Sequence, residues 1–257
     1  MIANFMLGGV ERRVDLSAGT CLAIPIDRHG QHPSFFIDQG VRFETLAAGD
    51  FTGRVSAGGS CNAEVITTIP HCHGTHTEGV GHITSNAQAV QDELETGLLP
   101  AALVSVQAQE RSADGQDGSG LIAAESLDWP ETARALIVRT LPNSPDKMHR
   151  DYASSPPYPL LSMAAIEKLV AAGIEHLLID TPSVDAADDG GRLLRHRRFW
   201  GMAPGDTVAV DERKHCTITE MIFVPDGLAD GLYLLNLGVG AIRSDAAASV
   251  PTIYPVT

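Results

Sequence analysis

Residues 70–84 combine metal-binding side chains with residues that exclude a regular helix. The stretch reads Pro-His-Cys-His-Gly-Thr-His-Thr-Glu-Gly-Val-Gly-His-Ile-Thr and holds four of the ten histidines in the chain. A leading proline and three internal glycines each disfavour an α-helix, whereas glycine allows a backbone to turn tightly. We therefore predict a compact loop that gathers its side chains, in place of a rigid helix face that spaces them.

The polar side chains of this loop are of the types that bind a divalent cation. They are His71, Cys72, His73, His76, Glu78 and His82. Imidazole, thiolate and carboxylate groups all coordinate zinc and similar ions. A surface loop with solvated histidines is the alternative interpretation. Histidine is an uncommon residue, however, and its concentration in one loop favours a metal site.

The loop resembles a motif of a known enzyme family. Bacterial kynurenine formamidases, isatin hydrolases and the wider metal-dependent cyclase family of hydrolases carry His-x-Gly-Thr-His-x-Asp-x-Pro-x-His. Four positions of residues 72–82 match it outright, namely Gly74, Thr75, His76 and His82. Three positions differ, with Cys72, Glu78 and Val80 in place of histidine, aspartate and proline. Thiolate and carboxylate can still coordinate zinc, so the chain resembles a divergent member. His71, beside Cys72, is a second candidate for the first ligand.

A second block is similar to the same family. Residues 179–185 read Ile-Asp-Thr-Pro-Ser-Val-Asp, and the family follows this sequence with a histidine, which is His196 here. Capping of a turn by Asp180 and Asp185 is the alternative to a role in the site. His196 lies among four arginines. Such cations would lower the pKa of its imidazole and keep it neutral, as a base or ligand requires, although a solvated basic stretch is also open.

A third block, residues 215–224, places a carboxylate in an apolar stripe. If the segment is a strand, alternate residues share one face, and these are Cys216, Ile218, Glu220, Ile222 and Val224. A buried Glu220 needs a compensating cation. A metal would provide it, and the family has Ile-x-Ile-x-Glu here; an ion pair with Arg139 or Arg198 is the alternative. His215 competes with His196 for the role of the family histidine, because the spacing implies an insertion.

These blocks predict a metal-dependent hydrolase of an amide, lactam or ester bond. The predicted ligands are Cys72, His76, Glu78, His82 and Glu220, with His196 as the proton carrier. A bound divalent ion would activate water and polarise the carbonyl group. We expect one or two ions, with zinc preferred because thiolate is a soft ligand, and manganese as the second choice. The resemblance implies a small aryl or cyclic substrate and an arylformamidase-like activity on C–N bonds other than peptide bonds.

Two other classes of function remain open at this point. Cys72 could be a nucleophile with His76 or His71 as its base, in a hydrolase that needs no metal. The protein could also be a non-enzymatic metal-binding or ligand-binding protein whose ion is structural. Structural zinc sites are closed by four ligands, whereas catalytic sites keep one position open. The mixture of carboxylate and imidazole favours the open kind.

Charge and composition limit the possible partners. The 257 residues carry a net charge of −14, which argues against nucleic acid and anionic membranes, and leaves a small-molecule substrate. The N-terminus lacks the basic region of a signal peptide, and no apolar run approaches the ~20 residues of a membrane helix. We expect a cytoplasmic protein with reduced cysteines, of which Cys21, Cys61 and Cys216 are buried. A homodimer or homotetramer is implied by the resemblance only.

The pattern of elements predicts one α/β domain over residues 1–257. Strands are expected at 64–69, 103–106, 135–139, 176–180, 217–224 and 231–237, and helices at 88–95 and 162–173. The order strand, helix, strand over 135–180 indicates a parallel crossover, and the remaining strands indicate antiparallel pairs. Surface loops are expected at 109–120, 143–159 and 186–191. The resemblance implies a mixed, barrel-like sheet with flanking helices, of the swivelling β/β/α type.

Overall fold

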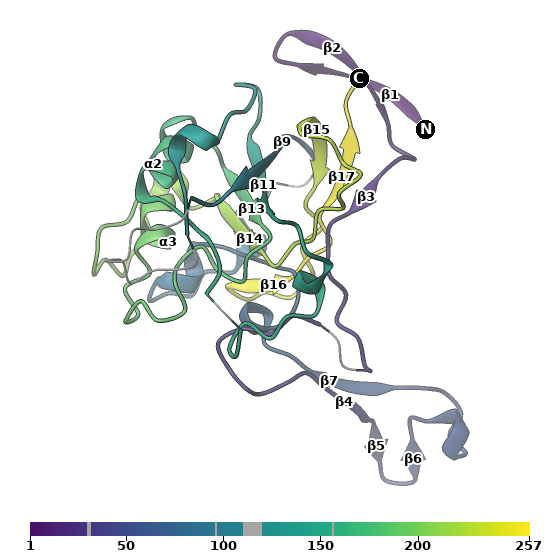
Figure 1. The fold of residues 1–257 in the computed structure, drawn as a ribbon. Helices are drawn as coiled ribbons and strands as arrows, with labels where there is room; N and C mark the ends of the chain where they lie inside the picture. The colour runs from purple at the N-terminus through teal and green to yellow at the C-terminus, as the bar shows by residue number, and fades with distance from the viewer. Residues whose placement is uncertain (30–31, 96, 110–119, 156) are drawn as a thin grey trace.

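A curled, mixed β-sheet of nine strands is the framework of the molecule (Figure 1). The computed structural model describes residues 1–29, 32–95, 97–109, 120–155 and 157–257. The strand order in the sheet is β16-β8-β14-β13-β11-β9-β15-β17-β3. The predicted α/β class is therefore confirmed. Most of the loop predicted at 109–120 lies outside the described residues.

Four parallel strands occupy the centre of the sheet. They are β9 (Leu98–Gln107), β11 (Ala135–Leu141), β13 (His176–Ile179) and β14 (Thr217–Glu220). Antiparallel strands extend the sheet on both sides, namely β3 (Thr20–Cys21), β8 (His76–Glu78), β15 (Gly231–Asn236), β16 (Ala246–Ala248) and β17 (Thr252–Pro255). The predicted combination of parallel and antiparallel pairs is thus confirmed.

Two helices cover one face of the sheet, α2 (Met163–Ala171) and α3 (Leu194–Phe199). Helix α2 joins the parallel neighbours β11 and β13, which confirms the predicted crossover. Ser162 caps α2, because its hydroxyl accepts a hydrogen bond from the Ala165 N–H. The helix buries Ala165, Ile166 and Leu169. Ala172 follows the last residue of the helix and is exposed.

The central strands bury both faces, as parallel strands between two layers do. Along β9, Ala102 and Val104 pack on the helix side, whereas Ala101 and Leu103 pack in the core on the opposite face. This alternation follows the two-residue period of a strand. Side chains along β14 alternate between the two faces in the same way. The face on which its last side chain projects is therefore set by the strand.

Small elements complete the chain. Short strands are β1 (Ile2–Leu7), β2 (Val10–Asp15), β4 (Arg42–Thr45), β5 (Ala47–Ala48), β6 (Phe51–Thr52), β7 (Glu64–Thr67), β10 (Leu121–Ile122) and β12 (Leu160–Leu161). Short helices are α1 (Val90–Glu93) and the 3-10 turns Val55–Ala57, Pro70–Cys72, Val80–Ile83, Ala124–Ser126, Pro145–Met148 and Asp211–Arg213. The helix predicted at 88–95 is therefore only four residues long. Among the described residues, no helix has the length and apolar character needed to cross a membrane.

The prediction for the cysteines was partly wrong. All four are free, but only Cys72 and Cys216 are buried, whereas Cys21 and Cys61 are exposed. Cys21 lies on the edge strand β3, and Cys61 precedes β7 in the projecting segment that carries strands β4–β7 (Figure 1).

Candidate metal centre

The centre of the sequence motif lies on an interior strand and its two ends lie in 3-10 turns, which corrects in part the prediction of a loop. His76, Thr77 and Glu78 form β8, which pairs with β14 on one side and β16 on the other. In the register, His76 lies opposite Glu220, and Glu78 opposite Ile218. The prediction that the segment is not an α-helix is confirmed. Its glycines define the turns that enter and leave the strand.

Alternation along β8 separates the structural from the functional side chains. Thr75 and Thr77 point to one face, where Thr75 Oγ1 accepts from the Ile24 N–H and donates to the Met221 carbonyl. Thr77 Oγ1 is 2.8 Å from Thr219 Oγ1. His76 and Glu78 point to the other face. The threonines hold the strand in register, and this fixes where the imidazole and the carboxylate project.

Two glycines are needed where the backbone turns. Gly74 has a φ angle of +66°, a conformation that favours glycine, and a Cβ there would lie 3.1 Å from Ile26 Cγ1. At Gly81 a Cβ would collide with the backbone of Gln88. The first glycine directs the chain into β8, and the second lets the turn that carries His82 pack closely.

Glu78 is the centre of the cluster. It is buried, and neither of its carboxylate oxygens has a hydrogen-bond partner of good geometry. His196 Nε2 lies 2.9 Å from Oε1, while His71 Nδ1 lies 3.0 Å and His82 Nε2 3.8 Å from Oε2. Burial raises the pKa of Glu78, but the three imidazoles outweigh it and lower the pKa well below its ordinary value. Glu78 is therefore a carboxylate that requires a cation.

His76 presents its free nitrogen to the same space. Its Nδ1 lies 3.2 Å from the Gly74 carbonyl oxygen, and a carbonyl can only accept, so Nδ1 carries the proton. Nε2 is consequently an acceptor, and it is buried without a hydrogen-bond partner at 3.5 Å from Glu220 Oε2. A buried unpaired acceptor costs free energy unless an ion or a donor satisfies it.

His196 enters the cluster from helix α3. Its Nδ1 lies 2.8 Å from Asp185 Oδ2, which fixes the proton on that nitrogen and turns Nε2 toward Glu78. The prediction that arginines lower its pKa was wrong. Burial lowers the pKa, but Glu78, Asp185 and Glu220 raise it well above the ordinary value. The neighbouring Arg195 donates to Asp185 and to the Leu161 carbonyl instead.

Glu220 is buried, as predicted, and lies at the carboxyl end of β14. The Val184 N–H donates to its Oε1 at 2.8 Å, and His196 Nε2 lies 3.7 Å from the same oxygen. The alternative partners are excluded, because Arg139 pairs with Asp230 and Arg198 pairs with Glu167. The predicted strand ends at Glu220. Met221 has a φ angle of +53°, so the regular alternation stops there.

The second sequence block divides between two places. Asp185 orients His196, as described above. Asp180 instead accepts hydrogen bonds from the Thr140 N–H and hydroxyl and lies 2.8 Å from the buried Lys147 Nζ. Burial raises the pKa of Asp180, and Lys147 opposes that rise. Asp180 and Lys147 thus tie β11 to β13, apart from the cluster around Glu78.

Two sequence candidates lie outside the cluster. Cys72 is buried in the wall of the adjoining cavity, but in the described part of the chain its sulfur makes no hydrogen bond or ion pair. Burial raises the pKa of its thiol. His71 takes the place next to Glu78 instead. His215 lies beside Cys216, with Nε2 at 3.8 Å from Sγ, and does not line the cavity that contains His196.

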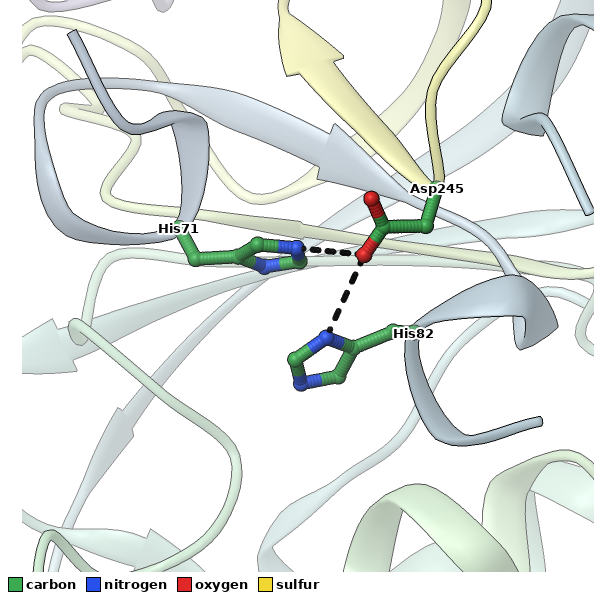
Figure 2. A group of neighbouring side chains, drawn as sticks. All are labelled: His71, His82 and Asp245. Atoms are coloured by element: carbon green, nitrogen blue, oxygen red, sulfur yellow. Dashed lines mark hydrogen bonds and ion pairs between the residues drawn. The ribbon is translucent and has the colours of Figure 1, made fainter. Parts of the chain in front are cut away.

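Asp245 also lies in the cluster, and the sequence did not predict it. It directly precedes β16, and its Oδ2 lies 2.9 Å from His71 Nε2 and 3.6 Å from His82 Nδ1 (Figure 2). Hydrogen bonds from His71 and His82 lower the pKa of Asp245. An aspartate preceded by serine near the C-terminus is too common a pattern to stand out. Its strand pairing with β8 is what brings it to the site.

A cavity of about 430 Å³ opens onto this cluster. His71, Glu78, His82, His196 and Glu220 line its base. Phe35, Phe36 and Leu193 contribute apolar walls, and residues 186–191, predicted as a surface loop, form another side. A concave, largely apolar space with a few convergent polar groups is typical of a small-molecule site.

The donor atoms fit a divalent ion. Three groups of three residues each bring their ligand atoms within 4.8 Å of one another. The first group is His71, His76 and Glu78, and the second is Glu78, His82 and His196. The third is His71, His82 and Asp245. Glu78 belongs to two groups, so it could bridge two ions. Imidazole and carboxylate ligands suit zinc and manganese. The predicted members His76, Glu78 and His82 thus belong to these groups, and so does His196. Glu220 and Cys72 belong to none of them, but Glu220 lies beside the cluster, 3.5 Å from His76 Nε2 and 3.7 Å from His196 Nε2.

A buried cluster of histidines and carboxylates thus lies beneath a cavity on a mixed β-sheet, and it is a candidate metal centre. The comparison with known families agrees. The family model described as "Putative cyclase" matches residues 14–186. The chain belongs to this cyclase family, as the motif at residues 72–82 predicted.

Solved structures share the fold at low identity. One, described as a potential metal-dependent hydrolase with cyclase activity, is 15% identical, with a TM-score of 0.59 and coverage of 92% of this chain and 98% of the other. Isatin hydrolase A from Labrenzia aggregata, bound to benzyl benzoate, is 15% identical, with a TM-score of 0.61 over 93% and 94% of the two chains. An isatin hydrolase bound to thioisatinate is 17% identical, with a TM-score of 0.58 over 94% of each. No curated protein matches the chain.

Proposed function

We propose that this protein is a metal-dependent hydrolase of an amide, lactam or ester bond in a small aryl or cyclic substrate. The observation that carries the proposal is Glu78, whose two buried carboxylate oxygens lack hydrogen-bond partners while three imidazoles face them below an apolar cavity. Such an arrangement is costly unless a cation compensates it.

The ligands in this proposal are His71, His76, Glu78, His196 and Glu220. A divalent ion held there would lower the pKa of a coordinated water and polarise the substrate carbonyl. Glu78 would serve as the central anionic ligand, because its two oxygens face different imidazoles. The backbone N–H of Val184 and the carboxylate of Asp185 orient Glu220 and His196 from outside. We favour zinc and retain manganese as the alternative metal.

His82 is the better placed residue to carry protons. Its side chain is 25% exposed and lines the cavity, whereas the side chain of His196 is 2% exposed and enclosed by carboxylates. A general acid or base must reach the substrate. The sequence assignment gave this role to His196 and made His82 a ligand. The two assignments predict different results for His82→Ala and His196→Ala.

The walls of the cavity support an apolar, ring-shaped substrate. Phe35 is buried, and its N–H donates to the Cys72 carbonyl, so it is fixed beside the site. Phe36 is 69% exposed, with a φ angle of +71°, and the Ile37 N–H donates to the Phe35 carbonyl across it. This tight turn is strained for a bulky residue, and such strain often occurs at ligand sites. An aryl ring between these walls would set its carbonyl over Glu78.

The proposal is tested by metal analysis combined with a substrate panel. We expect the purified protein to contain zinc or manganese, and to hydrolyse members of a panel of N-formyl arylamines, lactams and lactones. Removal of the metal by a chelator should abolish turnover, and re-addition should restore it. A matched panel of N-formyl alkylamines should be poorer substrates. A protein that binds no transition metal after reconstitution would contradict the proposal.

The thiol mechanism predicts a different result for Cys72. Burial raises the pKa of its thiol, and no imidazole lies within hydrogen-bonding distance in the described part of the chain, so the reactive thiolate is disfavoured. We expect Cys72→Ser to retain at least about half of the wild-type kcat, measured on the best substrate of the panel. Loss of activity in Cys72→Ser with the metal content unchanged would favour the metal-free alternative.

The accessible cavity also distinguishes the enzyme from a protein with a structural ion. A structural zinc ion is enclosed by four ligands, whereas here about 430 Å³ of space meets the cluster. We further propose that the protein is cytoplasmic and acts on a small molecule, and that its net charge of −14 disfavours binding to nucleic acid or anionic membranes. By resemblance to the family only, we propose a homodimer or homotetramer.

A further inference from the structure

We propose that Asp245 is a positioning residue of the metal centre, which holds His71 and His82 from behind so that both rings present their other nitrogen to Glu78. The proposal rests on the metal site of the proposed function. It assigns a role to a residue outside all three sequence blocks, and outside residues 14–186 that the family model matches.

The backbone fixes Asp245 to the strand that carries Glu78. Its carbonyl oxygen accepts the Gly79 N–H at 2.9 Å, and the next residue, Ala246, pairs directly with Glu78 in the β16–β8 register. The Ser244 hydroxyl donates to Oδ1 at 3.0 Å, which leaves Oδ2 for the imidazoles. Asp245 therefore moves with the site, because one pair of strands carries both.

His71 can serve only one of its two candidate groups. Its Nδ1 faces Glu78 at 3.0 Å, and its Nε2 makes a hydrogen bond of 2.9 Å to Asp245. A neutral imidazole has one proton and one lone pair, so the nitrogen that binds an ion leaves the other as a donor. The orphaned carboxylate of Glu78 and the free Nε2 of His76 converge on the Nδ1 side. Nε2 is therefore the nitrogen that keeps its proton, and Asp245 accepts it.

His82 has the same relation to Asp245 at longer distances. Its Nδ1 lies 3.6 Å from Oδ2 of Asp245 (Figure 2). Its Nε2 lies 3.8 Å from Oε2 of Glu78. The rings of His71 and His82 are tilted by 31°, with centroids 4.1 Å apart. One carboxylate oxygen thus sets the orientation of two stacked imidazoles.

The other histidines of the centre are held in the same way. Asp185 accepts from His196 Nδ1, and the Gly74 carbonyl accepts from His76 Nδ1. In each ring the outer nitrogen donates and the inner nitrogen faces the cluster, the arrangement by which a second acceptor orients a metal ligand. His71 needs such support most, because its side chain is 24% exposed and lies in the 3-10 turn Pro70–Cys72 rather than on a strand.

The test is zinc binding by the full-length Asp245→Asn and Asp245→Ala variants. Loss of an orienting acceptor typically weakens metal binding by about 10–100-fold. We expect a zinc dissociation constant raised about 10-fold in Asp245→Asn and up to about 100-fold in Asp245→Ala, measured by competition with a chromophoric chelator. The number of ions bound at saturation should not change. Asp211→Asn is the control, because it removes the same charge from an exposed position.

A second readout reports the ring geometry directly. In zinc-loaded protein labelled with ¹⁵N-histidine, the His71 signals, assigned from their loss in His71→Gln, should show coordination by Nδ1 and a protonated Nε2. That Nε2–H should exchange faster with solvent in Asp245→Asn. The melting temperature of the metal-free variants serves to detect a purely structural effect, and we expect it to match that of the wild type.

Three results would overturn the role of Asp245. They are coordination of zinc through His71 Nε2, loss of a whole equivalent of bound zinc in Asp245→Asn, and an affinity in both variants equal to that of Asp211→Asn. The first two would make Asp245 part of a metal site of its own. If the wild-type protein binds no metal, the proposed function fails as well. If the wild-type protein binds zinc and the Asp245 variants bind it as tightly as Asp211→Asn does, the role of Asp245 fails and the proposed function is retained.

Discussion

Replacing Glu78 by alanine should remove both the metal and the activity of the protein. Glu78 faces His71, His82 and His196, and belongs to two of the three candidate ligand groups. Without it, two of the three groups lose their only carboxylate. We expect turnover to fall to background, with less than about one tenth of the wild-type metal content, measured by elemental analysis after dialysis against a weak chelator.

The fold should survive this change in the absence of metal. Neither oxygen of Glu78 has a hydrogen-bond partner of good geometry, so the truncation leaves no new unsatisfied donor in the backbone. Glu78→Gln is the matched variant, because it keeps the shape and removes the charge. Both should melt close to the metal-free wild type. Wild-type metal content in Glu78→Ala would show that the ion binds elsewhere.

The second large effect concerns the division of labour between His82 and His196. If His82 carries protons, His82→Ala should keep its metal while kcat falls by about 10²–10⁴-fold, the usual contribution of general acid–base catalysis. His196→Ala should instead lose metal, because His196 Nε2 lies 2.9 Å from Glu78 and 3.7 Å from Glu220. Metal content and single-turnover rates, measured on the same preparations, separate the two roles.

The assignment from the sequence predicts the opposite pattern. In that case His196→Ala would retain its metal and lose turnover, and His82→Ala would lose metal. His215→Ala is the control for both, because His215 lies outside the cavity beside Cys216, and we expect it to be almost normal. Small, equal effects in His82→Ala and His196→Ala would contradict both assignments.

The sequence predicted the framework well for elements whose hydrophobic pattern and caps lie within the element itself. The apolar runs of β9, β11 and β13 and the capped helix α2 were recognisable, because their side-chain periods and the Ser162 cap are local properties. The strand β8 was missed for a physical reason. Three residues flanked by glycines have no independent strand signal, and only pairing with β14 and β16 gives them that structure.

The candidate site was predictable only in part for the same reason. His76, Glu78 and His82 come from one motif, and Glu220 was visible as a charge in an apolar stripe. His71, and not Cys72, lies beside Glu78, because the 3-10 turn before β8 sets the direction of each side chain. The spacing of residues in the sequence does not predict that direction. The rise in the pKa of His196 was missed because its arginine neighbours in sequence point to other partners. The position of Asp245 in the site depends on the pairing of β16 with β8, two strands far apart in the sequence.

The pairing of β16 with β8 has a consequence for the order in which the molecule is assembled. His71 and Asp245 are 174 positions apart in the chain, and β16 forms the edge of the nine-stranded sheet beside β8. During synthesis residues 70–84 leave the ribosome long before the segment with Asp245 that pairs with them. An ion captured early would meet an unfinished edge strand, so tight metal retention should begin only when the C-terminal residues have joined the sheet.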